Sequence, residues 1–304
     1  MSINKPVAPP PLSHIRQIVQ AALEEDIGFG DLTCNALFSP GMSAQAQIMA
    51  KEAMVVGGLA VAQEVFRQID GSLQLTFHQR DGAWVKANTQ LLTITGNAQS
   101  LLQGERVALN FIQRLSGISS LTRQFCHAVG DHSVKIADTR KTTPGLRSLE
   151  KWAVRLGGGS NHRFSLHDGI LIKDNHLLVL AANKISLSQA CRMAKQQASH
   201  GLRISVEVES LAQVREALQG KADIILLDNM SPSKIQQAVK IIKGQALVEV
   251  SGGITLNNIQ DMAKAGVDII SIGALTHSAA AMDLSLDIIP SAPQRKMKKW
   301  QTRS

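Results

Sequence analysis

Few residues in this chain are suited to stacking on nucleic-acid bases or to forming disulfides. Aromatic residues make up 3% of the sequence, and tyrosine is absent. The three cysteines include no Cys-x-x-Cys pair and are far apart in the chain: Cys34, Cys126 and Cys191. Widely spaced, odd-numbered cysteines are typical of reduced thiols in a protein core. A disulfide framework and an aromatic nucleic-acid-binding surface are therefore both disfavoured.

Long hydrophobic runs are also missing. No apolar stretch approaches the roughly 20 residues that a membrane-spanning helix requires. Residues 1–12 contain four prolines and lack the apolar core of a signal peptide. The sequence thus predicts a cytoplasmic protein with no membrane partner.

An excess of positive charge is present, but it is concentrated at one end. The formal net charge is +8, and five of these charges come from Arg295, Lys296, Lys298, Lys299 and Arg303. The rest of the chain carries only about +3, which an anionic substrate explains. No nucleic-acid partner is expected, because a short basic tail is usually a solvated end.

Two phosphate-binding signatures are absent as well. The chain contains neither G-x-G-x-x-G nor G-x-x-x-x-G-K-[ST], which disfavours a dinucleotide-binding domain and a nucleoside triphosphatase. A length of 304 residues favours two domains, or one barrel with an added domain.

The first half has the pattern of a small mixed α+β domain. Ser13 is positioned to cap a one-sided helix, and short alternating strands follow between residues 45 and 96. A helical stretch over 101–128 comes next, with Ser116 and Gly117 predicted to interrupt it.

The second half alternates short Val- and Ile-rich strands with amphipathic helices, which predicts a parallel sheet. Ser210, Ser231 and Thr255 are the expected helix N-caps. The six predicted strands span 134–138, 169–173, 204–209, 224–228, 247–251 and 269–273. Because each ends in a polar residue or glycine, they fit an incomplete parallel α/β barrel, whose strand ends meet at one mouth.

These elements predict five regions. They are a flexible proline-rich start (1–12), a mixed α+β domain (13–117), a barrel domain (118–275), a return segment packing on the first domain (276–294) and a basic tail (295–304).

Acidic, basic and glycine residues gather at the predicted strand ends. Glu207 and Glu209 are two residues apart and are expected on one face of a strand, with Asp228 at the end of the next. A cluster able to bind carboxylates consists of Arg140, Lys141, His162, Arg163 and Lys173. A phosphate-binding turn is expected at Ser251, Gly252, Gly253 and Gly273. The alternatives are a buried Glu–Lys173 ion pair and plain strand-to-helix turns, while the histidine spacing disfavours zinc.

Three long motifs carry a family resemblance. They are ADTRKTTPGLR at 137–147, KWAVRLGGGSNHR at 151–163 and LHDGILIKDNH at 166–176, with shorter matches such as VEVE at 206–209 and VSGGI at 250–254. The chain closely resembles the quinolinate phosphoribosyltransferase family over roughly residues 13–290. That resemblance implies an open-faced mixed domain beside an incomplete barrel, and a homodimer with active sites at the interface. Assembly into a higher oligomer stays open.

The resemblance also implies roles for individual residues. Quinolinate binding falls on Arg140, His162, Arg163 and Lys173, with Lys141 nearby and Arg106 supplied by the partner subunit. Phosphoribosyl pyrophosphate and Mg2+ would be held by Glu209 and Asp228, with phosphate contacts at Ser251, Gly252 and Gly273. Lys141, Glu209 and Asp228 are the expected catalytic residues.

One departure from the family leaves an assignment open. The segment between VEVE and LLDN is about two residues shorter than the commonest family spacing, so Glu207 remains an alternative to Glu209. Three other functions also remain open. They are a related transferase acting on nicotinate or another acidic acceptor, a lyase forming a Schiff base at Lys141 or Lys173, and nucleic-acid binding through the basic tail.

Overall fold

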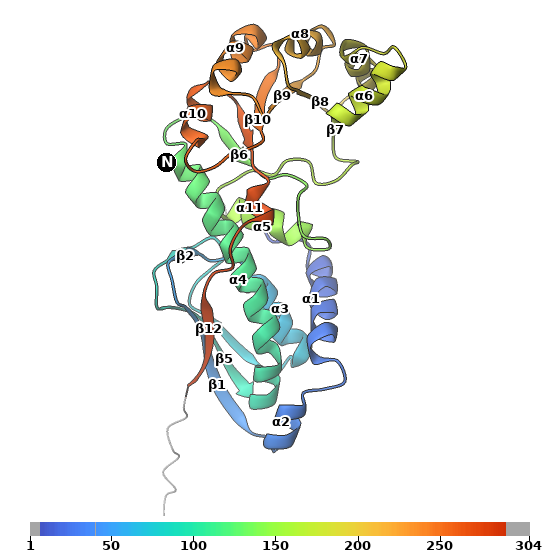
Figure 1. The fold of residues 1–304 in the computed structure, drawn as a ribbon. Coiled ribbons are helices and arrows are strands. Elements are labelled where there is room, and N and C mark those ends of the chain that lie inside the picture. Colours follow the sequence, from blue (N-terminus) through green and yellow to red (C-terminus); the bar gives the residue numbers. More distant parts are fainter. Residues whose placement is uncertain (1–6, 40, 290–304) are drawn as a thin grey trace, which may run out of the picture. The chain divides into compact units, whose positions relative to one another are not determined.

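The computed structural model describes residues 7–39 and 41–289 (Figure 1). The described residues divide into two compact units, of which the larger comprises 7–10 and 114–281 and the smaller 11–39, 41–113 and 282–289. The predicted basic tail at 295–304 lies outside the described residues, as do residues 1–6 of the proline-rich start and 290–294 of the return segment.

The smaller unit is built on an antiparallel sheet. Its strands follow the order β12-β1-β5-β3, and a separate pair joins β2 to β4. Its elements are α1 (Leu12–Ile27), α2 (Leu32–Leu37), β1 (Ser43–Ala50), β2 (Met54–Val55), α3 (Leu59–Ile69), β3 (Gln74–Phe77), β4 (Trp84–Val85), β5 (Thr89–Asn97) and β12 (Leu284–Ile289). The last strand of the chain thus pairs with the first, with Ala50 opposite Leu284.

Helix α1 buries one face through Ile15, Val19 and Leu23, as its periodicity predicts. The prediction that Ser13 caps this helix was wrong. The carbonyl of Pro11 accepts the first hydrogen bonds, from the N–H groups of His14 (2.9 Å) and Ile15 (3.2 Å). Pro11 already has φ at −51°, close to the helical value, so the helix begins at Leu12 and includes Ser13.

The larger unit contains six parallel strands in the order β6-β11-β10-β9-β8-β7. They are β6 (Lys135–Ala137), β7 (Ile170–Ile172), β8 (Ile204–Val208), β9 (Ile224–Asp228), β10 (Leu247–Ser251) and β11 (Ile269–Ser271). The first and last strands of this order, β6 and β7, are not paired with each other. The expected incomplete α/β barrel is therefore confirmed, together with a separate antiparallel sheet domain.

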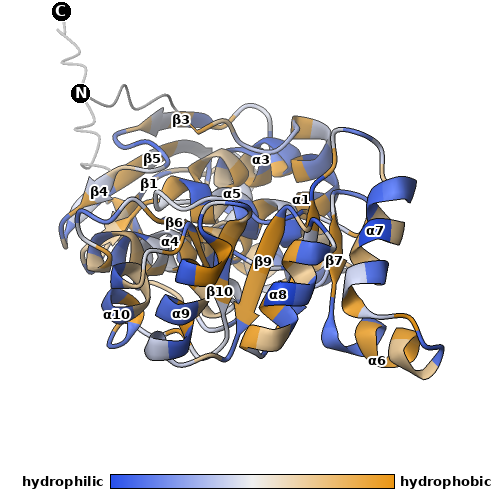
Figure 2. Cartoon of the chain, turned by 90° about the horizontal axis from the view of Figure 1, so that it is seen from above, coloured by the Kyte–Doolittle hydropathy of each residue, from blue (hydrophilic) through white to orange (hydrophobic). Residues whose placement is uncertain are grey.

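Helices connect the barrel strands and cover them on the outside. They are α5 (Arg147–Leu156), α6 (Asp174–Ala182), α7 (Leu187–Gln197), α8 (Leu211–Gln219), α9 (Pro232–Ile242), α10 (Ile259–Lys264) and α11 (Ala274–His277). Figure 2 shows hydrophobic colouring along β9 and β10 and hydrophilic patches on α8 and α9. This contrast follows from burial, because parallel strands are covered on both faces while helices keep one polar face.

Helix starts in the barrel were predicted with mixed success. Ser210 caps α8 by accepting a hydrogen bond from the Gln213 N–H, and Ser231 precedes α9 with Pro232 in its first turn. Thr255 was predicted wrongly as a cap. Its N–H donates to Asn258 Oδ1 (2.8 Å), which closes a turn first, so α10 begins only after Asn258.

Helix α4 (Ala98–Ala128) is continuous through Ser116 and Gly117, so the predicted interruption was wrong. Gly117 is required for packing instead. A Cβ atom at this position would lie 1.9 Å from the carbonyl oxygen of Ala280, a distance that no side chain tolerates. The glycine therefore allows the segment at residue 280 to pass directly over the helix.

Gly117→Ala is expected to destabilise the protein despite the better helix propensity of alanine. Alanine gains about 1 kcal/mol in a helix over glycine, whereas overpacking a closed site costs about 1–3 kcal/mol. A contact as short as this one belongs at the upper end of that range, so the melting temperature should fall. Gly201→Ala is the matched control, because a Cβ there meets no atom within 4 Å. Equal melting temperatures for both variants would contradict the close-packing role.

None of the helices formed by the described residues combines the length and hydropathy needed to cross a membrane.

Candidate active site

A cavity of about 570 Å3 lies at the carboxyl ends of the barrel strands. Ten residues singled out from the sequence line it: Arg140, Lys141, His162, Arg163, Lys173, Glu207, Asp228, Ser251, Gly252 and Gly253. Three others do not line it: Arg106, Glu209 and Gly273. The parallel arrangement explains the convergence, because every strand delivers its last residue to the same mouth.

The arginine and lysine side chains of the cavity have no acidic partner in the part of the chain that the structure describes. Within residues 7–39 and 41–289, no carboxylate lies at ion-pair distance from Arg140, Lys141, Arg163 or Lys173. The Nε atom of Arg140 is buried and also lacks a hydrogen-bond partner. Burial and the neighbouring Arg140 lower the pKa of Arg163. Uncompensated, partly buried guanidinium groups favour binding of an anion with more than one carboxylate.

A buried ion pair holds the segment that carries His162 and Arg163. Asp138 is fully buried and bonds to the Lys151 ammonium, to Asn161 Nδ2 (2.6 Å) and to the N–H of His162 (2.8 Å). Lys151 Nζ also donates to the His162 carbonyl (3.0 Å). Breaking such a pair typically costs about 3–5 kcal/mol, because one charge is left uncompensated. The backbone around His162 is thus fixed from two sides.

A second buried acid orders the turn after Arg140 and Lys141. Glu150 accepts hydrogen bonds from the Thr143 hydroxyl (2.8 Å), the Thr143 N–H (3.1 Å) and Arg114 Nη2 (2.8 Å). Thr276 Oγ1 donates to the Lys141 carbonyl (2.7 Å). These contacts come from side chains of the same unit and leave the Lys141 side chain free to line the cavity.

The acidic side of the cavity is formed by Glu207 on β8 and Asp228 at the end of β9. Burial and then the neighbouring Asp228 raise the pKa of Glu207, while Lys173 opposes the shift. Burial likewise raises the pKa of Asp228, against a hydrogen bond from Asn229 Nδ2 (2.7 Å) and the charge of Lys141. Two close, partly desolvated carboxylates favour a bound cation between them.

Glu209 lies outside this arrangement. Strand β8 ends at Val208, and the N–H of Glu209 donates to Gln213 Oε1 (2.8 Å) at the start of the following helix. The expected alternation of side chains therefore stops one residue before Glu209, whose side chain is exposed. Of the two glutamates left open by the sequence, the structure brings Glu207 into the cavity.

The turn after β10 approaches the turn after β9 closely. Gly252 has φ of +89°, and a Cβ atom there would lie 2.2 Å from Asn229 Oδ1. Any side chain at Gly252 would displace the Asn229 amide that orients Asp228. Gly273 does not line the cavity but lies beside it, since its Cβ would be 3.0 Å from Lys141 Cδ.

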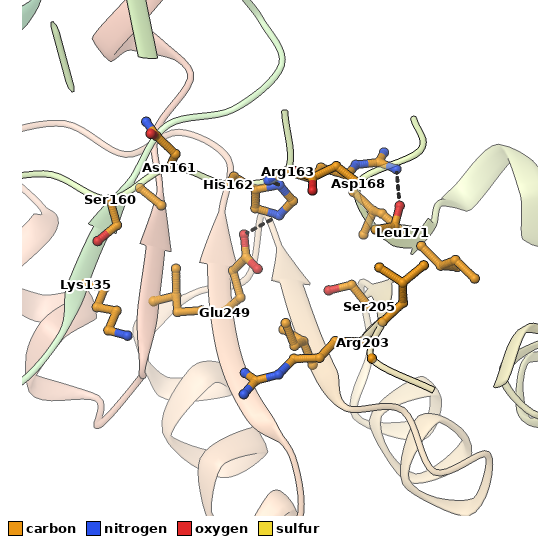
Figure 3. Close-up of a pocket in the computed structure, with 17 residues that line it drawn as sticks. Lys135, Ser160, Asn161, His162, Arg163, Asp168, Leu171, Arg203, Ser205 and Glu249 are labelled. Atoms are coloured by element: carbon orange, nitrogen blue, oxygen red, sulfur yellow. Dashed lines mark hydrogen bonds and ion pairs between the residues drawn. The ribbon is translucent and has the colours of Figure 1, made fainter. Parts of the chain in front are cut away.

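Sequence reasoning missed two polar residues of the cavity, Glu249 and Ser271. Glu249 and Ser271 each precede a predicted site residue by two positions in their strands. The period of two along a strand could have identified both. Figure 3 shows Glu249 beside His162 within the barrel.

Arg106 belongs to the smaller unit, on the part of α4 before Arg114. Its side chain is more than half exposed, and its Nη2 atom lies 3.9 Å from Glu105 Oε1.

Two family models match nearly the whole chain. The C-terminal domain of quinolinate phosphoribosyl transferase matches residues 118–287, and the N-terminal domain matches residues 31–116. The chain belongs to the quinolinate phosphoribosyltransferase family.

Similar members of this family are known from several organisms. A probable nicotinate-nucleotide pyrophosphorylase (carboxylating) of Bacillus subtilis is 43% identical over 274 residues, which cover 90% of this chain and 93% of the relative. The solved nicotinate-nucleotide pyrophosphorylase of Francisella tularensis has a TM-score of 0.86 and 38% identity, covering 94% of this chain and 99% of that one.

A second similar solved structure is that of the nicotinate-nucleotide pyrophosphorylase from Ehrlichia chaffeensis. It has a TM-score of 0.85 and 41% identity, covering 92% of this chain and 99% of that one. Human nicotinic acid phosphoribosyltransferase shares the fold alone, at a TM-score of 0.58 and 11% identity, with 96% of this chain and 76% of that one covered.

Proposed function

We propose that the protein transfers the phosphoribosyl group of phosphoribosyl pyrophosphate to quinolinate and releases nicotinate mononucleotide, pyrophosphate and CO2. The observation that carries this proposal is that one cavity brings together the cluster Arg140, Lys141, Arg163 and Lys173 with the carboxylates of Glu207 and Asp228. Family membership supports the same activity, because close relatives are carboxylating nicotinate-nucleotide pyrophosphorylases. The direct test is turnover with both substrates and Mg2+, with nicotinate as the comparison acceptor.

The basic side of the cavity would bind quinolinate. Its two carboxylates would be held by Arg140, Arg163 and Lys173, with His162 beside them. Arginine forks can hold a carboxylate through two parallel hydrogen bonds, which fixes the plane of the ring as well as its position. The ring nitrogen, which is the nucleophile, would then face the sugar.

The acidic side would bind phosphoribosyl pyrophosphate. Glu207 and Asp228 would contact the ribose and stabilise positive charge developing at C1 as pyrophosphate leaves. The turn at Ser251, Gly252 and Gly253 would bind the 5′-phosphate through backbone N–H groups. Lys141, whose charge acts on Asp228, would add a cation for the departing pyrophosphate.

The same carboxylates fit Mg2+. No group of three or more histidine, cysteine, aspartate or glutamate residues within the described part of the chain could hold a metal by itself. Glu207 and Asp228 nevertheless provide two carboxylates with raised pKa values, and Mg2+ commonly combines one or two carboxylates with substrate phosphates. When bound there, the ion would neutralise charge on pyrophosphate.

Decarboxylation would follow ribosyl transfer. Once the ring nitrogen carries the ribosyl group, the C2–carboxylate bond can break and leave its electron pair on C2, next to the positive nitrogen. That carbon then takes a proton. The pyridinium ring acts as the electron sink, so no covalent bond to the protein is needed.

The runner-up function is transfer to nicotinate or another acidic acceptor. The phosphoribosyl site would be the same, but one carboxylate would leave part of the basic cluster uncompensated. Release of CO2 from labelled quinolinate separates the two activities.

The proposal extends to a cytoplasmic homodimer whose subunits share active sites. Arg106, in the smaller unit, would complete the quinolinate site of the partner subunit. Shared sites are compatible with two-fold symmetry, in which each interface supplies the same residues twice.

Arg140→Ala or Lys173→Ala is expected to weaken quinolinate binding far more than phosphoribosyl pyrophosphate binding. Each substitution removes a charged partner of a carboxylate, at a cost of about 1.5–3 kcal/mol. Calorimetry with each ligand measures the two affinities. Lys184→Ala is a suitable control, because Lys184 is an exposed lysine outside the cavity. Equal losses for both ligands in a folded variant would overturn the assignment.

A further inference from the structure

Glu249 is a buried acid on one of the inner strands of the barrel sheet. It lies on β10, two residues before Ser251, and is only 1% exposed. Its Oε1 atom accepts a hydrogen bond from the Ser271 hydroxyl on the neighbouring strand β11. The same oxygen lies 3.5 Å from Nε2 of His162 (Figure 3). One carboxylate oxygen is therefore directed at both groups.

The other nitrogen of His162 is already engaged. The N–H of Arg163 donates to His162 Nδ1 at 2.8 Å. A nitrogen that accepts a hydrogen bond carries no proton, so the neutral ring must hold its proton on Nε2. That proton points to the side where Glu249 lies. The contact is consequently between a neutral imidazole N–H and a carboxylate, rather than between two full charges.

Glu249 Oε2 is buried without a hydrogen-bond partner among the described residues, as is Ser205 Oγ. Both residues border a second cavity of about 550 Å3 nearer the amino ends of the strands. His162 and Glu249 line both cavities and so form part of the wall between them.

The main chain of His162 does not fix its ring by itself. Asp138 and Lys151 hold its N–H and carbonyl, but rotation about the side-chain bonds would still reverse the ring. The ring itself is held at its two nitrogens, by the Arg163 N–H at Nδ1 and by Glu249 at Nε2. Glu249 is the only carboxylate in contact with this ring among the described residues.

We propose that Glu249 is a positioning residue, which fixes the Nε2–H side of the His162 ring while the Arg163 N–H fixes Nδ1, and so keeps the ring in place beside the acceptor. Ser271 assists by keeping Glu249 Oε1 in place. The inference rests on the proposed function for its kinetic part, since it assigns His162 to the acceptor. Its tautomer part concerns the free protein and does not depend on the substrate.

Nitrogen-15 NMR of the histidine side chains tests the tautomer directly, with His162→Gln used to assign the signal. In the wild-type protein, His162 should give one pyridine-like signal for Nδ1 and one pyrrole-like signal for Nε2. In Glu249→Ala the ring can turn away from the Arg163 N–H, so the two shifts should move toward their average as the tautomers exchange. A proton on Nδ1 in the wild-type protein would overturn the inference.

Steady-state kinetics test the consequence. Glu249→Ala should raise the KM for quinolinate by about tenfold, the loss expected from one charge-assisted contact, and leave the KM for phosphoribosyl pyrophosphate within about twofold. Glu249→Gln keeps an acceptor oxygen for the Nε2–H and should restore most of the affinity for quinolinate. Ser271→Ala should give a smaller effect than Glu249→Ala.

Two results would contradict the positioning role. One is an unchanged KM for quinolinate in Glu249→Ala, with the histidine shifts also unchanged. The other is an equal rise in both KM values, which a general loss of structure would cause. If neither the wild-type protein nor Glu249→Ala turns over quinolinate, the proposed function is wrong. The NMR experiment on His162 still tests the tautomer, because it needs no substrate.

Discussion

Glu207→Gln is expected to lower turnover by about 10²–10³-fold, the range observed when one preorganised electrostatic group is removed from an active site. The amide keeps the shape of the side chain but removes the charge that would stabilise the sugar cation and hold Mg2+. Quinolinate should still bind, because Arg140, Arg163 and Lys173 are untouched. Single-turnover rates and quinolinate calorimetry measure the two effects.

Glu209→Gln is the matched control. It makes the same chemical change two residues away, at an exposed side chain outside the cavity, and should retain a rate close to that of the wild-type protein. A collapse of turnover in Glu209→Gln with a normal rate in Glu207→Gln would reverse the assignment of the acid.

Loss of stability should not complicate this comparison. The pKa of Glu207 is raised in the folded protein, so its ionised form is disfavoured there. A carboxyl group with a raised pKa contributes stability at low pH and loses it as the pH rises through the folded value. At neutral pH the charge is thus a cost to folding, and Glu207→Gln should melt at the same temperature or slightly higher.

The second large effect concerns subunit sharing. Arg106→Ala and Lys173→Ala should each be nearly inactive alone, yet a mixture should regain activity. In a mixed dimer both lesions fall in one site and the other site is intact. With random exchange half of the dimers are mixed, and half of their sites are whole, so activity should approach about a quarter of the wild-type value.

This test requires that both variants fold, dimerise and exchange subunits. Size-exclusion chromatography and exchange between differently labelled subunits establish these points. If exchange is complete and no activity returns, Arg106 acts within its own subunit or has no role in the site.

Much of the barrel followed from the sequence because its signals are local. The bounds of β9 and β10 were predicted without error, since a parallel strand covered on both faces is a continuous run of Val, Ile and Leu. The prediction that Gly117 interrupts a helix was wrong, because the glycine is needed instead for its contact with Ala280, more than 160 residues away. The sequence alone shows that a glycine is present, but not which distant segment of the chain packs against it.

The site residues also include some that the sequence could predict and some that it could not. Lys173 follows β7 directly, and Arg140 and Lys141 come within four residues of the end of β6, so their convergence could be predicted from the fold class. The choice between Glu207 and Glu209 could not, because it depends on a hydrogen bond from the Glu209 backbone to Gln213 that ends the strand. Glu249 was missed because a single acid inside a hydrophobic strand shows no partner until β10, β11 and the segment around His162 are assembled.

The pairing of β12 with β1 has a consequence for synthesis on the ribosome. Residues of β1 emerge early, but the strand that pairs along one of its edges emerges only after the whole sequence of the barrel, so β1 must wait with that edge unpaired. Long-range pairing of this kind is slow and exposes a strand edge to other chains meanwhile. The nascent protein should therefore depend on chaperones more than its finished fold suggests, and moving the β12 sequence ahead of β1 by circular permutation should shorten that interval.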